Sequence, residues 1–418
     1  MIANPEIHPL ENGLRHYPSR TVQVFKTTHL TRILHNHILE TDADRWRKEF
    51  TSEQWIKSLF VMQIQKFHQV RDFLEQFEQN NHWQMICGFQ GNVPTQGQYS
   101  RKIPDQRIQE VLVRTYQTYQ RVIPLQQQKL PFTPSFAQLE ALQASYYPFR
   151  MDCTGFEISS DRYAYATVGY VATEKKALPS ARLHVIQEAL HGIITNYGPS
   201  GGHEHESPVA NFLLKETEEI NAWLRENAIQ EQLRPFITFD RGYWKRRRFQ
   251  ELDQRGWGWN IPWKKRTMVG VQLEILKFPT TKSEPIEVLV WASGLDLPWR
   301  RIIGKLEPPS DQVWDVLTND WILRAVTILQ LQKERWEIEQ LFQWLKQHTT
   351  IKRPLGTTWM HFVTHCLLVT LLQIILVFYL LLSGFPRWQL YLARLLKDLR
   401  HSDMEPWPDR YLIGEKVF

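Results

Sequence analysis

Cysteine is scarce in this chain of 418 residues. It occurs only as Cys87, Cys153 and Cys366, far apart and without a Cys-x-x-Cys pair. This spacing argues against a disulfide framework and against a structural zinc site. The N-terminal segment also lacks the basic and then apolar pattern of a secretory signal peptide. We therefore expect a protein of a reducing, cytoplasmic compartment.

Internal repeats, low-complexity tracts and a strong net charge are absent as well. The 50 lysines and arginines against 44 aspartates and glutamates leave a formal charge of +6, which points to a partner only where it is clustered. Hydrophobic residues make up 43% and charged residues 22%, so wholesale disorder is excluded and an ordinary core is available. The length predicts two or three domains. The mild basic excess and the 17 tryptophans are the two unusual features of the composition.

Long apolar runs are limited to one segment, residues 362–382. A helix of about 20 residues is long enough to cross a bilayer. The segment nevertheless contains Thr364, His365 and Gln373. A helix that is apolar on all sides can equally be the central buried helix of a large domain. We predict the buried helix, and a membrane anchor remains the alternative.

Residues 42–119 show the three- and four-residue spacing of apolar side chains that is typical of amphipathic helices. Ser52 is the predicted N-cap of the first strong helix. A loop with glycine and proline at 87–105 separates this region from a further helix over 108–123. We predict a helical, DNA-binding N-terminal domain over residues 1–145. Helix–loop–helix patterns also occur in helical domains of other kinds, so the pattern alone is a weak signal for DNA.

Strand-like alternation with intervening turn residues begins near Tyr146. Residues 181–201 fit either two strands or a helix, and we favour strands. Ser207 followed by Pro208 predicts the start of a helix. The predicted elements are strands at 146–158, 161–172 and 235–239, a helix at 207–227, a strand-rich segment at 256–318 and one long helix at 321–347.

Three acidic residues stand at informative places in this pattern. Asp152 follows the apolar run YYPFRM, Asp240 follows PFITF, and Glu339 lies on the long helix. Two acids at the ends of adjacent buried strands, with a third from a helix that crosses them, can hold two Mg or Mn ions. Such ions activate water for phosphodiester cleavage. For any one acid alone, a turn or surface role is the ordinary alternative.

The long helix also carries a charged face. Arg335, Glu339 and Lys346 follow one another at steps of four and seven residues, which places all three on one side of a helix. A carboxylate between two cations suits a residue that holds metal while its neighbours grip phosphates. Trp336 and Leu341 are among the apolar residues around these charges, which indicates a packed helix rather than a solvated one.

This helix resembles the signature helix of the insertion-sequence-four family of bacterial DDE transposases, whose motif is Tyr-x2-Arg-x3-Glu-x6-Lys. Arg335, Glu339 and Lys346 match the motif, and Gln332 stands at the tyrosine position. FITFDRGYW resembles the family's Asp-Arg-Gly-Tyr motif, and FRMDCTG resembles its first-Asp strand. GGHEHESP resembles its Gly-x-x-His-Asp-Ser loop, with Glu206 in place of aspartate. The HEHE sequence lacks the i, i+4 histidine pair of a helical zinc site, so we assign it to that loop.

The resemblance extends over residues 146–382 and implies an α/β fold, with a ribonuclease H-like catalytic core interrupted by a β-rich insertion and preceded by a helical N-terminal domain. It implies that Asp152, Asp240 and Glu339 are the catalytic, metal-binding triad for two Mg or Mn ions. Trp314 of the insertion would stack on a flipped base, although a core role is an equally open interpretation. The implied domains are 1–145, the core at 146–255 and 321–383, the insertion at 256–320 and a tail at 384–418.

Basic clusters accompany these motifs. Such runs are usually solvated surface, but three of them near a metal-triad motif favour contacts with DNA phosphates. The predicted DNA-binding residues are Arg335, Lys346, Trp314, Arg241, Tyr243, Lys245, Arg246, Arg247, Arg248, Lys264, Lys265, Arg266, Lys352 and Arg353.

The sequence therefore predicts a transposase. It would cleave the terminal inverted repeats of its own mobile element in a metal-dependent reaction and join the freed 3′-hydroxyl to target DNA. The expected partners are double-stranded DNA and a second copy of the chain, in the bacterial cytoplasm at the nucleoid and without a membrane. The second hypothesis is a catalytically degenerate relative that binds DNA without cutting it, and Gln332 is the feature that supports it.

Overall fold

The structure is a computed structural model of the whole chain. It describes residues 19–44, 49–125, 134–171, 175–203, 208–215, 233–263, 271–277, 284–292, 297–306, 312–385 and 388–401. The chain divides into two compact units. The first consists of Met1–Pro131, Ser160–Tyr165 and Trp344–Phe418, and the second consists of Phe132–Ser159 and Ala166–Gln343.

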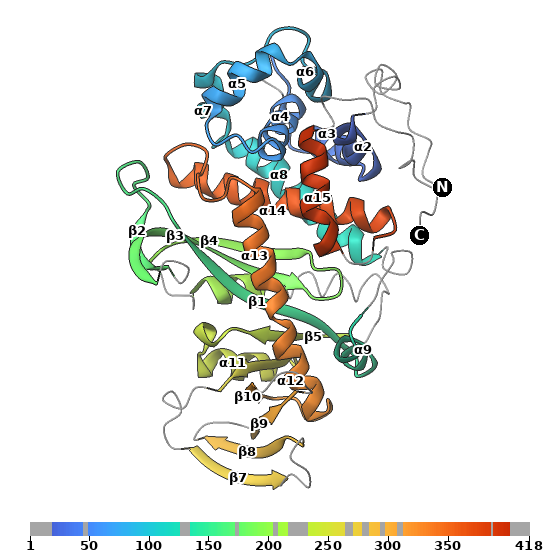
Figure 1. Cartoon of the computed structure of the whole chain (residues 1–418), viewed down its shortest axis with the longest axis vertical. Coiled ribbons are helices and arrows are strands. Elements are labelled where there is room, and N and C mark those ends of the chain that lie inside the picture. Colours follow the sequence, from blue (N-terminus) through green and yellow to red (C-terminus); the bar gives the residue numbers. More distant parts are fainter. Residues whose placement is uncertain are drawn as a thin grey trace. The chain divides into compact units, whose positions relative to one another are not determined.

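The first unit is built from helices (Figure 1). They are α2 (Arg20–Thr27), α3 (Leu30–Glu40), α4 (Ser52–Ile64), α5 (Val70–Gln79), α6 (Asn81–Cys87), α7 (Gln96–Lys102), α8 (Gln106–Leu125), α14 (Trp359–Leu382) and α15 (Trp388–His401), together with the end of α13 (Trp336–His348). The side chain of Thr51 accepts a hydrogen bond from the backbone N–H of Gln54, and the backbone N–H of Thr51 donates to Oε1 of Gln54, which completes a capping box. Thr51 is thus the N-cap of α4, and the predicted cap, Ser52, is its first helical residue.

The apolar run at residues 362–382 forms most of α14. Among the described residues, α14 is the one helix long and apolar enough to cross a membrane, and 89% of its most apolar window is buried. Helices α2, α4, α8 and α15 pack around it. Its polar side chains have partners in this interior, since the amide of Gln109 donates to the hydroxyl of Thr364 at 2.6 Å. The prediction of a buried helix is confirmed.

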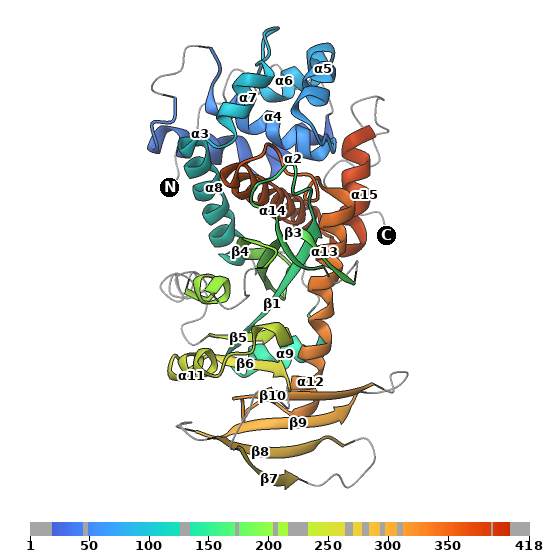
Figure 2. The same cartoon turned by 90° about the vertical axis from the view of Figure 1, so that its left-hand side faces the viewer.

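The second unit is organised around one mixed sheet (Figure 2). Its strands are β1 (Tyr146–Glu157), β2 (Thr167–Val171), β3 (Lys176–Glu188), β4 (Ile194–Gly201), β5 (Arg234–Phe239), β6 (Gly258–Pro262), β7 (Val271–Lys277), β8 (Ile286–Ala292), β9 (Trp299–Lys305) and β10 (Val313–Thr318). The order is β2-β3-β1-β5-β6-β10-β9-β8-β7, with β4 paired to β3. Strands β1, β5 and β6 are parallel to one another, and the other pairs are antiparallel.

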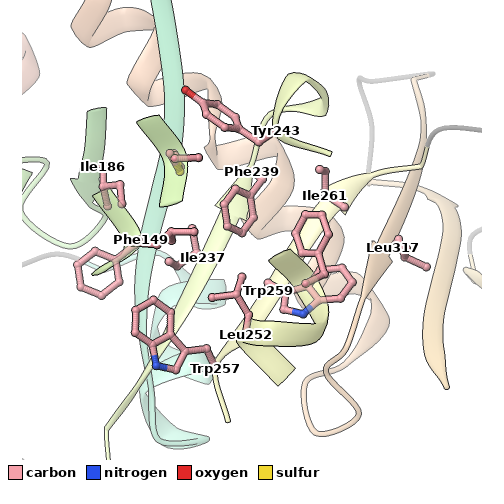
Figure 3. Packing of buried hydrophobic residues seen from close by; sticks show 14 of the residues in the cluster. Phe149, Ile186, Ile237, Phe239, Tyr243, Leu252, Trp257, Trp259, Ile261 and Leu317 are labelled. Carbon is pink, nitrogen blue, oxygen red and sulfur yellow. The ribbon is translucent and has the colours of Figure 1, made fainter. Parts of the chain in front are cut away.

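Helices cover both faces of this sheet, and the alternation of side chains along each strand decides which residues meet which helices. Phe149, Ile237 and Phe239 point into a cluster that also contains residues of α11 (Arg246–Gln254) and of the helical segment 208–215 (Figure 3). The even-numbered residues Tyr146 and Phe236 point into a second cluster. Its other members come from α9 (Phe136–Gln143), α12 (Ala325–Glu334) and strands β9 and β10.

Most of the predicted elements are confirmed. Residues 181–201 form strands, as favoured, and 235–239 lie in β5. The segment 256–318 contains β6 to β10. The helix predicted at 207–227 is seen over 208–215, and the rest of it lies outside the described residues. The chain is therefore mixed α/β with a helical N-terminal region, while the boundaries of the five domains stay a prediction.

The single long helix predicted at 321–347 is wrong. The carboxylate of Asp320 accepts hydrogen bonds from the backbone of Ile322 at 3.1 Å and of Leu323 at 2.6 Å, which turns the chain and delays the start of α12 to Ala325. A one-residue interruption at Arg335 then separates α12 from α13, where the N–H of Ile338 bonds to the carbonyl three residues back.

Candidate active site

Two parallel strands place Asp152 and Asp240 side by side. In the pairing of β1 with β5, Met151 lies opposite Phe239, and the backbone N–H of Asp240 donates to the carbonyl of Met151 at 3.2 Å. The aspartate is the next residue on each strand. Both carboxylates follow the even-numbered side chains, so they lie on the sheet face that α12 covers.

Backbone donors orient the two aspartates. Oδ1 of Asp152 accepts from the N–H of Cys153 at 2.7 Å. Oδ2 of Asp240 accepts from the N–H of Gly242 at 3.0 Å and so caps the short 3-10 helix η2 (Arg241–Tyr243). The other oxygen of each carboxylate is directed to a guanidinium.

That guanidinium belongs to Arg335, at the junction between α12 and α13. It bonds to Oδ2 of Asp152 through Nη1 and to Oε1 of Glu339 through Nη2, the latter at 2.9 Å. Its Nη2 also lies 3.6 Å from Oδ1 of Asp240. One cation therefore joins all three carboxylates of the predicted triad, and the face shared by Arg335 and Glu339 is confirmed by direct contact.

Burial and the neighbouring charges shift the pKa of Asp152 and of Arg335. Burial raises the pKa of Asp152 to about 8; Arg335 opposes this rise, and Asp240 and Glu339 add to it. Burial lowers the pKa of Arg335, but the three carboxylates more than reverse that effect and hold the pKa above its ordinary value. Three acids around one guanidinium therefore favour the entry of a further cation.

The donor set fits a hard divalent cation. Mg and Mn are held by carboxylate oxygens, and the side chains of Asp240 and Glu339 are 38% and 31% exposed, so the site opens to solvent on their side. Within the described part of the chain, no three acidic, histidine or cysteine groups are gathered closely enough to share one ion directly. In the triad it is the guanidinium of Arg335 that links the carboxylates.

A second buried ion pair lies beside the triad, and the sequence reasoning missed it. The side chain of Arg150 is 2% exposed, with Nη1 2.8 Å from Oε2 of Glu337 and Nη2 3.7 Å from Oε2 of Glu334. Arg150 precedes Asp152 by two residues and faces the same helices. Strand β1 thus contacts helices α12 and α13 through two adjacent ionic contacts. In one the strand supplies the acid, Asp152, and in the other it supplies the cation, Arg150. An arginine inside the apolar run YYPFRM was the available signal.

Gln332, at the position of the motif tyrosine, lies in the interior. It is 1% exposed, and its Nε2 donates to the carbonyl of Phe239 at 3.4 Å. Its Oε1 is buried and has no hydrogen-bond partner among the described residues. The residue at this position therefore contacts the end of β5, directly before Asp240.

Exposed cations follow Asp240. Arg241, Lys245 and Arg247 are exposed, and Arg246 is half-buried. These residues keep the accessibility that the predicted contacts with DNA require. A cavity of about 230 Å³ is lined by Lys245, Arg247, Arg248, Asn211 and Glu251.

Two of the predicted DNA-binding residues are buried instead. Tyr243 is 1% exposed, and its hydroxyl pairs with Nδ1 of His184 at 2.9 Å. Arg248 is 2% exposed and donates to Oδ1 of Asn211 at 3.0 Å and to the carbonyl of Tyr243 at 2.6 Å. Both side chains serve packing in this structure, because the amphipathic α11 and the η2 turn direct them inward. We therefore do not include Tyr243 and Arg248 among the residues proposed below to contact DNA.

Trp314 is half-buried on β10, opposite Gly304 of β9. Its ring packs against the cluster formed with α9 and α12, and its Nε1 is buried without a hydrogen-bond partner among the described residues. These contacts agree with a packing role, and base stacking by Trp314 stays a prediction.

The remaining predicted residues are scattered. Lys346 is half-buried on α13, and Lys352 and Arg353 are exposed in the turn after it. His203 is exposed, and its N–H donates to the hydroxyl of Thr167 at 3.2 Å. Lys264, Lys265, Arg266 and Glu206 lie outside the described residues.

Comparison with known proteins adds an independent finding. Residues 150–375, more than half of the chain, match a family model described as "Transposase DDE domain". A 64-residue stretch is 45% identical to a protein of Sinorhizobium fredii (strain NBRC 101917 / NGR234) named "Putative transposase y4zB"; it covers 15% of this chain and 17% of that protein. The cryo-EM structure of a piggyBac transposase synaptic complex with hairpin DNA aligns over 96% of this chain and 84% of that chain. Its TM-score of 0.43 and identity of 11% are too low to carry an argument.

Proposed function

This chain belongs to the Transposase DDE domain family, and from that premise we propose that it is a transposase of the insertion-sequence-four type, which cleaves the ends of a mobile element and joins them to target DNA. The observation that carries the proposal is the convergence of Asp152, Asp240 and Glu339 on Arg335. Two neighbouring parallel strands and a crossing helix bring these residues together from distant parts of the chain.

We also propose that the catalytic core is ribonuclease H-like. The order β4-β3-β1-β5-β6 supports this assignment, because β4, β3 and β1 are antiparallel neighbours while β5 and β6 run parallel to β1. Strands β7 to β10 continue the same sheet beyond β6 and would form the β-rich insertion. With β6 (Gly258–Pro262) in the core, the insertion would begin after β6 and not at residue 256, where the sequence placed it.

Asp152, Asp240 and Glu339 would hold the divalent ions. When bound, Mg or Mn supplies an activated water and stabilises the leaving oxygen of a phosphodiester. The chain itself holds the acids in place: the backbone of Cys153 and Gly242 fixes one oxygen of each aspartate. Arg335 neutralises the acids in this structure, and its guanidinium would be available to bind a phosphate where the three carboxylates hold divalent ions.

Arg241, Lys245 and Arg247 would contact DNA phosphates next to the cleaved bond. They are exposed and follow Asp240 within seven residues of sequence, so they present cations beside the site. Of the three, Arg247 also pairs with Glu251 at 3.0 Å and stays exposed. Two copies of the chain would act on two ends in one complex, a proposal that the mass of the DNA-bound complex tests.

A metal-dependent nicking assay on DNA that carries the element's ends tests the proposal. We expect Asp152→Asn, Asp240→Asn and Glu339→Gln each to abolish cleavage while DNA binding persists. Glu157→Gln is the matched control, because Glu157 is an exposed acid on the same strand as Asp152. The Glu157→Gln variant should cleave DNA like the unaltered chain. Cleavage retained by any triad variant would sink the assignment.

The second candidate function is a DNA-binding relative that does not cut. Gln332 favours it, because a buried glutamine on α12, bonded to the last residue of β5, replaces the motif tyrosine. Full DNA binding without any nicking in Mg or Mn by the unaltered chain would decide for this alternative.

A further inference from the structure

Six basic side chains gather in the first unit from three segments that are far apart in sequence. One segment follows α4, the second includes the end of α13 and the turn after it, and the third is the end of α15. We call this set the Lys66 cluster, and it consists of Lys66, His68, His348, Lys352, Arg353 and Arg400.

Two of these cations hold the segments together at the C-terminal end of α13. Nζ of Lys66 donates to the carbonyl of Gln347 at 2.5 Å. Nη2 of Arg400 donates to the carbonyl of His348 at 2.6 Å, and its Nε donates to the carbonyl of Ile64 at 2.6 Å. Cations at a helix C-terminus satisfy its last carbonyls and its partial negative charge. These bonds use only part of the donors of each group.

The described part of the chain offers the cluster no acidic counterpart. Among the described residues, no carboxylate lies within 4.0 Å of any of its six basic groups. Burial, and then the neighbouring cations of the cluster, lower the pKa of Lys66, His68 and His348. Lys352 and Arg353 are exposed and donate no side-chain hydrogen bond to the described residues. A cluster built only to tie helices together does not need these two further charges.

The backbone at Lys66 points the same way. Lys66 has φ 61, and the N–H groups of Lys66 and Phe67 bond to the carbonyls of Gln63 and Met62. This is the Schellman pattern that ends a helix, and its left-handed position favours glycine. A lysine there costs about 1 kcal/mol relative to glycine. Its side chain supplies what glycine cannot: the hydrogen bond to the carbonyl of Gln347 and a positive charge in the cluster.

We propose that the Lys66 cluster binds the phosphate backbone of double-stranded DNA. The proposal rests on the proposed function for the choice of DNA as the polyanion. It adds to that function a phosphate-binding surface in the first unit, in which Lys66, His68, His348 and Arg400 join the two cations after α13.

Salt-dependent binding of the full chain to a random-sequence duplex of about 30 base pairs tests the proposal. Each phosphate contact contributes about 0.9 to the slope of log affinity against log salt. Between about 50 and 200 mM salt, the loss of affinity should therefore be about tenfold smaller for Lys352→Gln/Arg353→Gln than for the unaltered chain. For Lys66→Gly it should be about threefold smaller.

Lys175→Gly is the matched control for Lys66→Gly. Lys175 is a lysine with positive φ as well, 51, and it lies exposed in the second unit directly before β3, whereas Lys66 is half-buried. The salt slope of Lys175→Gly should equal that of the unaltered chain. If Lys66→Gly does not fold, the exposed double variant carries the test, because both of its side chains project from a surface turn.

Slopes that match the control in both variants would overturn the proposal, and so would a chain that does not bind the duplex. Asp152→Asn separates this outcome from a failure of the proposed function. If the cluster variants show a smaller slope and the unaltered chain does not nick DNA, the proposed enzymatic function is refuted and the proposed DNA-binding surface stands. If nicking depends on Asp152 and the salt slopes of the cluster variants equal that of the unaltered chain, only the proposed DNA-binding surface is refuted.

Discussion

Replacement of the buried Arg150 should destabilise the second unit in a way that depends on pH. The Arg150 side chain is 2% exposed and faces Glu337 at 2.8 Å and Glu334 at 3.7 Å. Arg150→Met keeps much of the apolar volume and removes the charge. Glu334, whose side chain is 8% exposed, is then left as a buried acid without its cation, whereas Glu337, at 35%, can turn to water.

Breaking a buried ion pair from one side costs about 3–5 kcal/mol. We expect the lower end, about 3 kcal/mol at neutral pH, because Glu334 can neutralise itself by binding a proton. Burial already raises the pKa of Glu334, and Arg150 opposes that rise. Without Arg150 the pKa goes higher still. An acid with a raised pKa in the folded state destabilises the fold as pH rises above its unfolded value, so the deficit should shrink as the pH falls toward about 4.5.

Urea unfolding followed by tryptophan fluorescence measures this deficit. For a unit of about 200 residues, 3 kcal/mol corresponds to a fall in melting temperature of roughly 6–12 °C. Arg150→Met/Glu334→Gln should recover most of the loss at neutral pH, because no buried charge is left unpaired. A deficit that is equal near pH 5 and pH 8, or equal in the single and double variants, would refute the reasoning.

Three further predictions concern buried positions of the second unit. Burial lowers the pKa of His184 to about 3, so the stability that the neutral imidazole contributes is complete above about pH 6.5 and is lost as the pH falls toward 3. In acid unfolding between about pH 6 and 4, the free energy of unfolding of His184→Asn should therefore fall by about 1.4 kcal/mol less per pH unit than that of the unaltered chain. Gln332→Tyr restores the motif residue at a position that is 1% exposed and should cost about 1–3 kcal/mol by overpacking; an unchanged urea midpoint would contradict this. In Gly258→Ala the new Cβ would meet Cδ2 of Phe236 at 2.4 Å, so calorimetry should show a loss of about 2 kcal/mol, and a wild-type melting temperature would exclude that clash.

Most of the elements, and three members of the candidate site, could be proposed from the sequence alone. Alternation and turn residues are local properties, and they predicted strands at 146–158 and 235–239 and the buried helix α14. The prediction of one long helix failed at the start of the helix and at Arg335. There a turn made by the side chain of Asp320 and a tightened hydrogen bond compete with the apolar period, and neither leaves a periodic signal.

Asp152, Asp240 and Glu339 were available from the sequence because each stands in a motif of fixed spacing. What only the tertiary structure decided is how they meet. The parallel register of β1 with β5, set by contacts between residues far apart in the chain, brings the two aspartates together. The same packing makes Arg335 the bridge among all three acids and buries Tyr243 in the interior. Spacing along a chain fixes faces of single elements, whereas register and burial depend on every element that packs against them.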